Sequence, residues 1–301
     1  MRTIGIIGLG HVGRLLAHHL IATASVDKLV LIDQHDDLAV GVQADLDDAS
    51  TALLSQPEII IQDYAALQDS QVLVIAIDGG DDNLIKTGRS IMDIARRVKS
   101  SGFHGIVINL TDPNEAVAGF LQEQLALPSK QVIGIGTVLD TARMRRAVAN
   151  VAQVSPAAVS GFVYGQHGHN KSFAWSTVHV NGQPIEETIN GHKLDSSQLA
   201  IQADLDGWYT EKGLGYNADA VVSWTARIIS AIQTDEQLAL PIAIFQPQYS
   251  TYVGFPALIG RHGVGNFILC HLLPVEEMAV KTAADEIQQQ LSYLRELEGQ
   301  E

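Results

Sequence analysis

The feature that most constrains the fold of this chain is an alternation of short apolar runs with helical patterns along its first 140 residues. Each run is at most six residues long and rich in β-branched side chains. The runs are Ile4–Ile7, Leu29–Ile32, Ile59–Ile61, Val72–Ile77, Ile106–Leu110 and Val132–Ile135. Because nearly every position is apolar, not every second one, these runs are typical of strands buried on both faces of a parallel sheet.

The stretches between these runs carry helical patterns. Apolar side chains recur at i, i+3, i+4 and i+7 along residues 90–99, and a second stripe follows Pro113, a residue suited to a first helical turn. The two stripes are Ile91, Ile94, Ala95 and Val98, and then Ala116, Val117, Phe120, Leu121 and Leu125. Short connections between strands and helices imply right-handed crossovers, so the sequence predicts an α/β fold with a doubly wound parallel sheet.

Hairpin and helix signals replace this alternation in the second half of the chain. The strand-like segments Ser172–Val180 and Gln183–Ile185 are joined by Asn181-Gly182, a pair that supplies the positive φ angles of a type I′ turn. Two more strand-like segments flank Pro256. A closing helix has an apolar stripe suited to docking on the body or on a neighbouring subunit, formed by Val280, Ala284, Ile287, Leu291 and Leu294. We expect a first domain over residues 1–138 and an α+β domain over residues 139–301.

A glycine-rich turn follows the first apolar run. Gly8, Gly10 and Gly13, with His11 and Val12 between them, form a G-x-G-x-x-G motif that opens a helical pattern. On a strand–turn–helix unit, Gly8 allows the tight turn, Gly10 lets the backbone approach a pyrophosphate, and Gly13 allows close contact of helix and sheet. The helix N-terminus offers unpaired N–H groups to phosphates. This turn therefore predicts a dinucleotide site.

Asp33 ends the second apolar run, 20 residues after Gly13, where a carboxylate would accept hydrogen bonds from both ribose hydroxyls. Residues 34–37 include no Lys or Arg that could bind a 2′-phosphate, so NAD is favoured over NADP. The alternative for Asp33 is a surface residue that caps the next helix. The spacing favours the first interpretation, and so predicts a Rossmann domain that binds NAD.

The composition excludes several classes of protein. The chain has 19 Lys and Arg against 34 Asp and Glu, a formal charge of −15 that would repel nucleic acid and anionic lipid. No apolar stretch reaches the roughly 18–20 residues that cross a bilayer. Cys270 is the single cysteine, which rules out an intrachain disulfide and fits a reducing compartment. The first ten residues lack a secretory signal, so we expect a cytoplasmic protein.

Asp140 and Arg143 stand out in the segment Gly136–Arg143. Asp140 could be a helix N-cap. Arg143 would then lie in the first helical turn, where a cation opposes the helix dipole, and such local mismatches occur most often at functional sites. A guanidinium facing a cleft could hold a carboxylate through two parallel hydrogen bonds. These residues alone leave a functional and a solvated Arg143 equally open.

His167 lies between two strand-like segments and is flanked by glycines in Gly165–Gly168, which free the backbone and expose the imidazole. A loop histidine without a role is the alternative. A metal site formed with His169 is disfavoured because no cluster of Cys, Asp or Glu lies nearby, so we expect no metal. The imidazoles of His11 and His262 are also expected to have no role.

Taken together, these segments resemble the L-lactate/malate dehydrogenase superfamily and, more narrowly, its L-2-hydroxyisocaproate dehydrogenase branch. The resemblance covers most of the chain, and LDTAR at 139–143 and GQHG at 165–168 are its most specific motifs. The other matching segments are IGIIGLGHVG at 4–13, SGFHGIVI at 101–108, VIGIGTVLDTARMRRAV at 132–148, FAWSTVHVNGQPI at 173–185 and FPALIGRHGV at 255–264. The resemblance implies a small 2-oxo or 2-hydroxy acid as substrate and a homodimer or homotetramer.

The resemblance also implies a role for each of three side chains. His167 would be the general acid and base, giving a proton to the substrate carbonyl oxygen or taking it back. Asp140 would hold the imidazole tautomer and stabilise the imidazolium, and Arg143 would bind the substrate carboxylate. The hydride chemistry itself belongs to NAD.

Three departures from the family pattern concern the substrate. The segment Ile77–Asn83 passes quickly into a helix, so the lid that carries an Arg in the family is several residues short. Arg89 is either a displaced equivalent of that Arg or a solvated residue of the first helical turn. Asp112 stands where the family has an amide close to substrate and nicotinamide, and Asn217 where it has a Thr close to substrate. All three are candidate substrate-binding residues.

Two functions from different classes remain open. The first is an NAD-dependent dehydrogenase of medium-sized aliphatic 2-oxo acids, which the set Asp140, Arg143 and His167 favours. The second is a non-catalytic or weakly catalytic NAD-binding protein, which the short lid, Asp112 and Asn217 favour. A related but distinct possibility is a changed substrate, one that lacks the carboxylate or carries a cation to meet Asp112.

Overall fold

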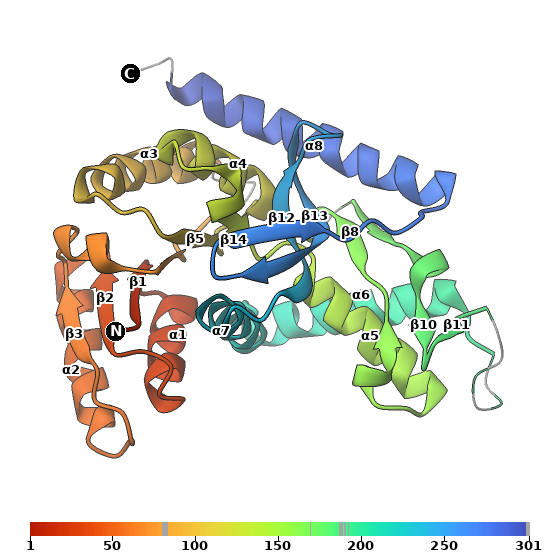
Figure 1. Ribbon diagram of the computed structural model, residues 1–301, viewed down its shortest axis with the longest axis horizontal. Coiled ribbons are helices and arrows are strands. Elements are labelled where there is room, and N and C mark those ends of the chain that lie inside the picture. The colour runs from red at the N-terminus through yellow and green to blue at the C-terminus, as the bar shows by residue number, and fades with distance from the viewer. Residues whose placement is uncertain (80–83, 169, 187–188, 190, 192, 299–301) are drawn as a thin grey trace.

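Six parallel strands form one half of an eleven-stranded sheet, in the order β3-β2-β1-β4-β5-β6 (Figure 1). The computed structural model describes residues 1–79, 84–168, 170–186, 189, 191 and 193–298. The strands are β1 (Thr3–Ile7), β2 (Lys28–Ile32), β3 (Glu58–Ile61), β4 (Val72–Ile75), β5 (Ile106–Asn109) and β6 (Val132–Gly134). This is the strand order of a doubly wound dinucleotide-binding domain, and it confirms the predicted fold class.

The six strands begin and end within two residues of the predicted runs. Every side chain of β1, β4 and β5 is buried, as the continuous apolar character predicted. Strand β4 ends at Ile75 instead of Ile77. The reason is that the hydroxyl of Thr111 lies 3.2 Å from both the N and the O atom of Ile77, so a side chain takes the place of the next strand partner.

The helices of the first half pack in two groups (Figure 1). Helices α3 and α4 lie side by side beneath α8 (Pro274–Glu298), whereas α1 contacts α2 and α7 (Ala218–Thr234). Both predicted apolar stripes are buried, on α3 and α4 respectively, and Pro113 is the residue just before α4 and not part of its first turn. The helices are α1 (His11–Ala22), α2 (Asp36–Ser50), α3 (Leu84–Ser101), α4 (Asn114–Leu125) and α5 (Val138–Ala152).

The second half extends the same sheet with antiparallel strands. Strand β12 pairs with β6 through Ala243 and Gly134, and the order continues β12-β13-β8-β9 with β14 beside β13. A second, three-stranded sheet has the order β11-β10-β7. The remaining elements are β7 (Val159–Ser160), β8 (Val163–Gly165), β9 (Lys171–Phe173), β10 (His179–Val180), β11 (Gln183–Pro184), α6 (Ser196–Leu214), α7 (Ala218–Thr234), β12 (Leu238–Gln246), β13 (Thr251–Gly260), β14 (Gly263–Phe267) and α8 (Pro274–Glu298).

Pro256 corrects one prediction, because it lies inside β13 instead of between two strands. The register places it opposite Pro241 of β12. The carbonyl of Pro241 accepts a hydrogen bond from Thr137 N, and that of Pro256 accepts one from Ile268 N. The two prolines therefore direct their main-chain groups away from each other, so neither missing N–H removes a bond between β12 and β13.

The predicted hairpin is confirmed at its turn and corrected in its first strand. Asn181 and Gly182 have φ angles of 51° and 82°, and join β10 to β11. The segment Ser172–Val180 is not one strand, because a 3-10 turn at Trp175–Thr177 separates β9 from β10. Glu276 holds this turn: its carboxylate accepts bonds from the Ser176 N at 3.0 Å and the Ser176 hydroxyl at 2.5 Å.

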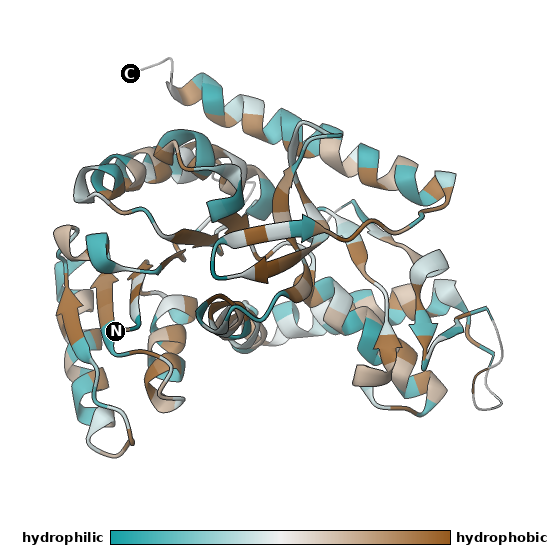
Figure 2. Ribbon diagram, in the orientation of Figure 1, coloured by the Kyte–Doolittle hydropathy of each residue, from teal (hydrophilic) through white to brown (hydrophobic). Residues whose placement is uncertain are grey.

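The closing helix α8 docks on the body of the same chain. Its predicted stripe is at most 3% exposed, and the helix contacts α3, α4 and β13. Since this stripe is covered within the chain, it carries no information on oligomers. Figure 2 shows the hydrophobic residues concentrated in the central strands and on the inner sides of the helices. None of the described helices combines the length and apolar character that a membrane span requires.

Candidate active site

The glycine turn between β1 and α1 packs tightly at its two outer glycines. Gly8 has a φ angle of +97°, and a Cβ atom there would lie 2.3 Å from the carbonyl oxygen of Ala76. A Cβ atom on Gly13 would lie 1.8 Å from the carbonyl oxygen of Gly8. At both positions a side chain would collide with a main-chain carbonyl oxygen, so glycine is required there, as predicted.

Gly10 differs because almost nothing of the protein lies next to it. The nearest atom to a Cβ built there is Oδ1 of Asp78, at 4.0 Å. Gly10 is also the N-cap of α1, and no side chain among the described residues caps that helix end. The loop thus leaves a bare backbone and a positive helix terminus open to an anion, and the pyrophosphate of NAD fits this arrangement.

Asp33 lies at the end of β2 and closes the same turn. Its Oδ2 atom accepts a hydrogen bond from Leu9 N at 2.7 Å, and its Oδ1 atom accepts one from His35 N at 2.9 Å. Helix α2 begins after His35 without a side-chain cap, so Asp33 is not the capping residue that the alternative required. Each carboxylate oxygen keeps a lone pair for a ribose hydroxyl.

The connection between α6 and α7 reaches the glycine turn. The imidazole of His11 stacks on the ring of Tyr216, with centroids 4.3 Å apart and 10° between the planes. The next residue, Asn217, is the N-cap of α7 and accepts a hydrogen bond from Nη2 of Arg143 at 3.0 Å. The nucleotide turn and the predicted substrate residues are therefore neighbours in space.

Asp140 and His167 form a close pair. Asp140 lies in the first turn of α5, which has Thr137 as its N-cap, so Asp140 is not the N-cap. Its Oδ2 atom is 2.7 Å from Nδ1 of His167, in the loop after β8. The Asp140 side chain is 1% exposed and that of His167 is 23% exposed, so solvent reaches only the imidazole. The pair has the geometry of a carboxylate that orients an acid–base imidazole.

Charge shifts the proton affinities of both members. Burial would raise the pKa of Asp140, but the charge and hydrogen bond of His167, together with Lys171, outweigh it and hold this pKa well below its usual range. Burial would lower the pKa of His167, but Asp140, and then Asp112 and Glu115, raise it to about 9. The imidazole is therefore charged at neutral pH and ready to donate a proton.

Lys171 is a member of the site that the sequence did not single out. Its Nζ atom lies 3.2 Å from Oδ1 of Asp140 and 2.7 Å from Oδ1 of Asp204 on α6. One oxygen of Asp140 thus contacts the imidazole of His167, and the other contacts the ammonium of Lys171. The only sequence signal was the position of Lys171 four residues after His167 on the next strand, and this did not reveal its partners.

Glu115 is the second residue of the site that the sequence did not single out. It is fully buried in the first turn of α4, and its Oε1 atom accepts a hydrogen bond from His167 N at 3.0 Å. Asp112, exposed just before this helix, is close enough for its charge to raise the pKa of both Glu115 and His167. The signal for Glu115 in the sequence was its position: it is a carboxylate in the first turn of the helix that follows Pro113.

Arg143 is half-buried and held in place, so a fully solvated side chain is excluded. Besides its bond to Asn217, its guanidinium packs on α6, where a Cβ atom on Gly207 would lie 2.8 Å from Nη1. It lies near enough to Asp140 to lower the pKa of that carboxyl. The structure therefore brings five of the predicted site residues together: Asp140, Arg143, His167, Asp112 and Asn217.

Arg89 is not brought into this group. It is exposed on α3 and makes no hydrogen bond or ion pair with any residue that the structure describes. The neighbouring Gly88 packs against Leu294 and Leu297 of α8. Residues 80–83 of the shortened lid lie outside the described residues, and so does His169.

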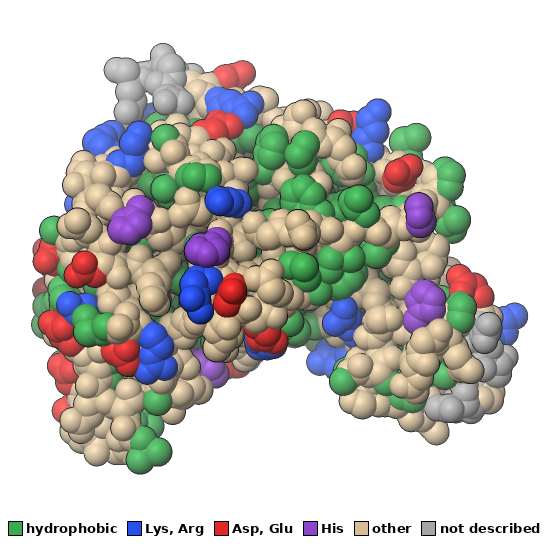
Figure 3. Space-filling model, in the orientation of Figure 1, with side chains coloured by type: hydrophobic (Ala, Val, Ile, Leu, Met, Phe, Trp, Pro, Cys, Tyr) green, Lys and Arg blue, Asp and Glu red, His purple; other side chains and the backbone are tan. Residues whose placement is uncertain are grey.

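Within the part of the chain that the structure describes, no three His, Cys, Asp or Glu residues are grouped as metal ligands. On the face shown in Figure 3, Lys and Arg side chains are interspersed with Asp and Glu.

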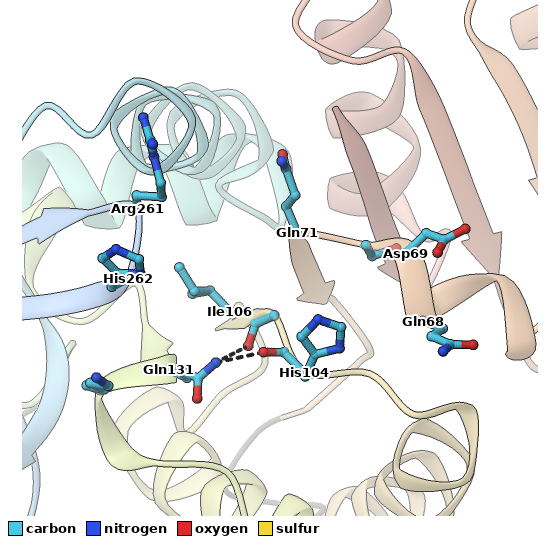
Figure 4. A pocket seen from close by; sticks show the side chains of 11 residues that line it. Gln68, Asp69, Gln71, His104, Ile106, Gln131, Arg261 and His262 are labelled. Atoms are coloured by element: carbon cyan, nitrogen blue, oxygen red, sulfur yellow. Dashed lines mark hydrogen bonds between the residues drawn. The ribbon is translucent and has the colours of Figure 1, made fainter. Parts of the chain in front are cut away.

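A hollow of about 560 Å³ lies before the starts of β4, β5 and β6 (Figure 4). There the amide of Gln131 is bound to the carbonyls of His104 and Gly105, and Arg261 points away from both (Figure 4).

Comparison with known proteins shows which family this chain matches. Residues 2–134 match the NAD-binding domain of lactate/malate dehydrogenases, and residues 137–203 match the α/β C-terminal domain of the same family. The L-lactate dehydrogenase 2 of Lactococcus lactis is 27% identical over 98% of this chain and 98% of its own length. The L-lactate dehydrogenase 3 of Bacillus cereus is 29% identical over 92% of each chain.

Solved structures agree with these matches. The minor L-lactate dehydrogenase of Enterococcus mundtii, in its ligand-bound form, superposes with a TM-score of 0.91 at 26% identity, covering 97% of this chain and 98% of that one. The lactate dehydrogenase of Cryptosporidium parvum, complexed with lactic acid and NAD, shares the fold with a TM-score of 0.90 at 24% identity and 98% coverage of both chains. These relatives are lactate dehydrogenases, and the narrower hydroxyisocaproate branch is not confirmed by them. The chain belongs to the lactate/malate dehydrogenase family of NAD-dependent oxidoreductases that act on 2-hydroxy acids.

Proposed function

We propose that this protein is an NAD-dependent L-2-hydroxyacid dehydrogenase that interconverts a medium-sized aliphatic 2-oxo acid, similar to 2-oxoisocaproate, and its 2-hydroxy acid. The observation that carries this proposal is the 2.7 Å pairing of His167 with the buried Asp140, one helical turn from Arg143. The size of the substrate rests on the resemblance to the hydroxyisocaproate branch.

In this proposal each side chain has one task. His167 donates the proton from Nε2 to the substrate carbonyl oxygen, and in the reverse direction it removes that proton from the hydroxyl. Asp140 keeps Nδ1 protonated and stabilises the imidazolium. Arg143 binds the substrate carboxylate through two N–H groups, while Asn217 fixes the guanidinium by accepting the bond from Nη2.

Bound NAD supplies the hydride chemistry. The backbone at Gly8, Gly10 and Gly13, with His11 and Val12 at the start of α1, would hold its pyrophosphate, and Asp33 its ribose. The bare N-terminus of α1 and the open space beside Gly10 support these assignments. We also propose that the substrate domain begins near residue 139, which is supported by two family matches that meet between residues 134 and 137.

Assembly and location complete the proposal. The family resemblance supports a homodimer or homotetramer, and the single Cys270 is consistent with a cytoplasmic protein. Size-exclusion chromatography with light scattering tests the assembly, because a monomer at micromolar concentration would contradict it.

NADH oxidation with a panel of 2-oxo acids, from pyruvate to 2-oxoisocaproate, tests the activity. We expect turnover with at least one of them, and His167→Ala should lower kcat/KM by about 10²–10⁴-fold. His104→Ala is the matched control, because the imidazole of His104 is exposed and its one hydrogen bond within the described part of the chain is to the carbonyl of Gly102. Turnover that is indifferent to His167→Ala would reject the assigned mechanism.

A non-catalytic NAD-binding protein is the second candidate. It is favoured by the exposed Arg89, which has no partner among the described side chains, and by the charge of Asp112 close to His167. Removing a donor to the developing oxyanion typically costs about 10²–10³-fold in rate. This candidate predicts that NAD raises the melting temperature although no 2-oxo acid in the panel supports turnover, and rapid NADH oxidation would exclude it.

The variant Asp112→Asn also distinguishes an ordinary 2-oxo acid substrate from one that carries a cation. In the first case Asp112→Asn removes a charge that repels the 2-oxo carboxylate, so KM for that acid should fall. If the natural substrate carries a cation, the same variant should lose the native activity while it gains reduction of ordinary 2-oxo acids. A variant with neither change would contradict a substrate contact of Asp112.

A further inference from the structure

Glu115 combines complete burial with a direct bond to the segment that carries the acid–base histidine. It lies in the first turn of α4, and its Oε1 atom accepts the main-chain N–H of His167 at 3.0 Å. This contact joins α4 to the loop after β8. The proton chemistry assigned to His167 uses Nδ1 and Nε2 of the ring, so the contact with the main chain has a separate purpose.

The second oxygen of Glu115 has no hydrogen-bond partner in the described part of the chain, although it is completely buried. A buried acceptor without a partner is costly, and a buried charge is more costly still. A purely structural acceptor for one N–H could have been an amide or a hydroxyl. A carboxyl group at this position therefore needs a reason that involves its charge.

Four charged groups besides Glu115 surround His167. The negative charge comes from Asp140 on α5 and Asp112 before α4, whereas the positive charge comes from Lys171 on β9 and Arg143 on α5. Asp204 on α6 shares the Lys171 ammonium, at 2.7 Å. With Glu115 ionised, the carboxylates of this cluster therefore outnumber its two fixed cations, and the excess of negative charge is smallest when the imidazole carries its proton.

We propose that Glu115 is a positioning residue for His167: one carboxylate oxygen fixes the main chain of the histidine, and the negative charge keeps the proton on its imidazole. This inference rests on the proposed function, in which His167 is the acid and base. Glu115 thereby acts on the reaction through His167, without a contact to the substrate.

The coupling between the two groups is reciprocal. Burial raises the pKa of Glu115 to about 7, against the opposing effect of a charged His167. When the imidazole gives its proton to the substrate, this opposing charge disappears and Glu115 binds a proton more readily. Glu115 is therefore the carboxyl group that compensates the charge lost from the ring, since Asp140 is held ionised by Lys171.

The test compares three variants by NMR titration of the His167 ring in the protein without cofactor or substrate. Glu115→Gln keeps an oxygen for the His167 N–H but removes the charge, so the midpoint of the imidazole should fall by about one pH unit. Glu115→Asp restores the charge and should return most of that change. Glu123→Gln is the matched control on the same helix, because its partner is Arg295 on α8, and it should leave the midpoint unchanged.

Kinetics give a second readout that a merely structural role would not move. In Glu115→Gln the pH at which kcat/KM for 2-oxo acid reduction declines should move down by the same amount. An unchanged midpoint in a folded Glu115→Gln variant would overturn the inference. If that variant does not fold, the His167 resonance of the unmodified protein decides instead: a second inflection from the titration of Glu115 would support the coupling, and a single inflection would overturn it.

If the proposed function were wrong, the two measurements would give a different combination of results. The unmodified chain would then oxidise no NADH with any 2-oxo acid, although the His167 midpoint would still move in Glu115→Gln. The titration needs neither NAD nor substrate, so this result would support the coupling of Glu115 to His167 while it removed its role in turnover.

Discussion

Nδ1 of His167 lies 2.7 Å from one oxygen of Asp140, and the other oxygen of Asp140 lies 3.2 Å from the ammonium of Lys171. The carboxylate is 1% exposed and shares its charge between these two cations. An imidazole bonded through Nδ1 presents Nε2 to a substrate, and a neighbouring carboxylate that remains ionised stabilises the proton there. The pKa of His167 therefore depends on how strongly Asp140 interacts with the imidazole and how strongly with Lys171.

Replacing Asp140 with Asn tests this dependence. The amide oxygen can still accept the Nδ1–H bond, but without the charge the pKa of His167 should fall by more than one pH unit. We expect kcat/KM to fall by about 10²-fold or more, because the reduction requires a protonated imidazole. NMR titration and steady-state kinetics measure the two effects. Asp206→Asn is the control, because it removes the charge of a half-buried carboxylate that pairs with Arg146 and accepts a hydrogen bond from Gln202.

Lys171→Met should act in the opposite direction on the histidine. Without the ammonium, the charge of Asp140 acts on the imidazole alone, so the pKa of His167 should rise further. The variant should also lose about 1–3 kcal/mol of unfolding free energy, because Asp140 stays buried with one partner fewer. Lys28→Met is the control: its side chain is equally buried at 15% exposure, but its partner Glu58 is 60% exposed. Equal losses in both variants in chemical denaturation would contradict the bridging role.

The parallel half of the fold could be predicted because its signals are local. Strands buried on both faces must be apolar at nearly every position, and a helix that packs on one side must repeat its apolar residues every three or four positions. The glycine turn is equally local, since Gly8 and Gly13 are needed where the chain meets itself within a few residues. The largest shift of a boundary, two residues at the end of β4, occurs where the Thr111 side chain replaces a strand partner.

The rest of the site depends on contacts between residues far apart in the sequence. Glu115 reaches His167 across 52 positions, and Lys171 reaches Asp140 across 31. A buried carboxylate and a strand lysine have no pattern in the sequence that names their partners, because tertiary packing alone brings them together. For the same reason Pro256 was predicted to separate two strands: its tolerance inside β13 depends on Pro241 in the opposite strand.

The glycine turn offers a matched pair of substitutions that separates cofactor binding from folding. A methyl group at Gly10 meets open space, whereas one at Gly13 would strike the carbonyl of Gly8. We expect Gly10→Ala to leave the melting temperature of the free protein unchanged and to weaken NAD binding at least tenfold. Gly13→Ala should lower the unfolding free energy by about 1–3 kcal/mol. Calorimetry with and without NAD measures both, and undiminished NAD affinity in Gly10→Ala would contradict a pyrophosphate at this turn.

The free energy of unfolding should fall as pH rises, because two buried groups bind protons more tightly in the folded chain. Glu115 has a pKa of about 7 instead of 4.5, so its contribution is complete below pH 4.5 and is lost as pH rises through 7. His167 has a pKa of about 9 instead of 6.5, so its contribution is complete below pH 6.5 and is lost as pH rises through 9. Because a tenfold change in proton affinity corresponds to about 1.4 kcal/mol, each group accounts for roughly 3 kcal/mol.

Denaturation curves at pH 5, 7 and 9 separate the two contributions. Glu115→Gln should remove the decline between pH 5 and 7 and retain much of the later one, since Asp140 still holds the imidazolium. The variant should therefore be more stable than the unmodified protein at pH 8, where an ionised Glu115 is buried with one oxygen unpartnered among the described residues. Parallel curves for the two proteins across this range would mean that Glu115 does not change its protonation when the chain unfolds.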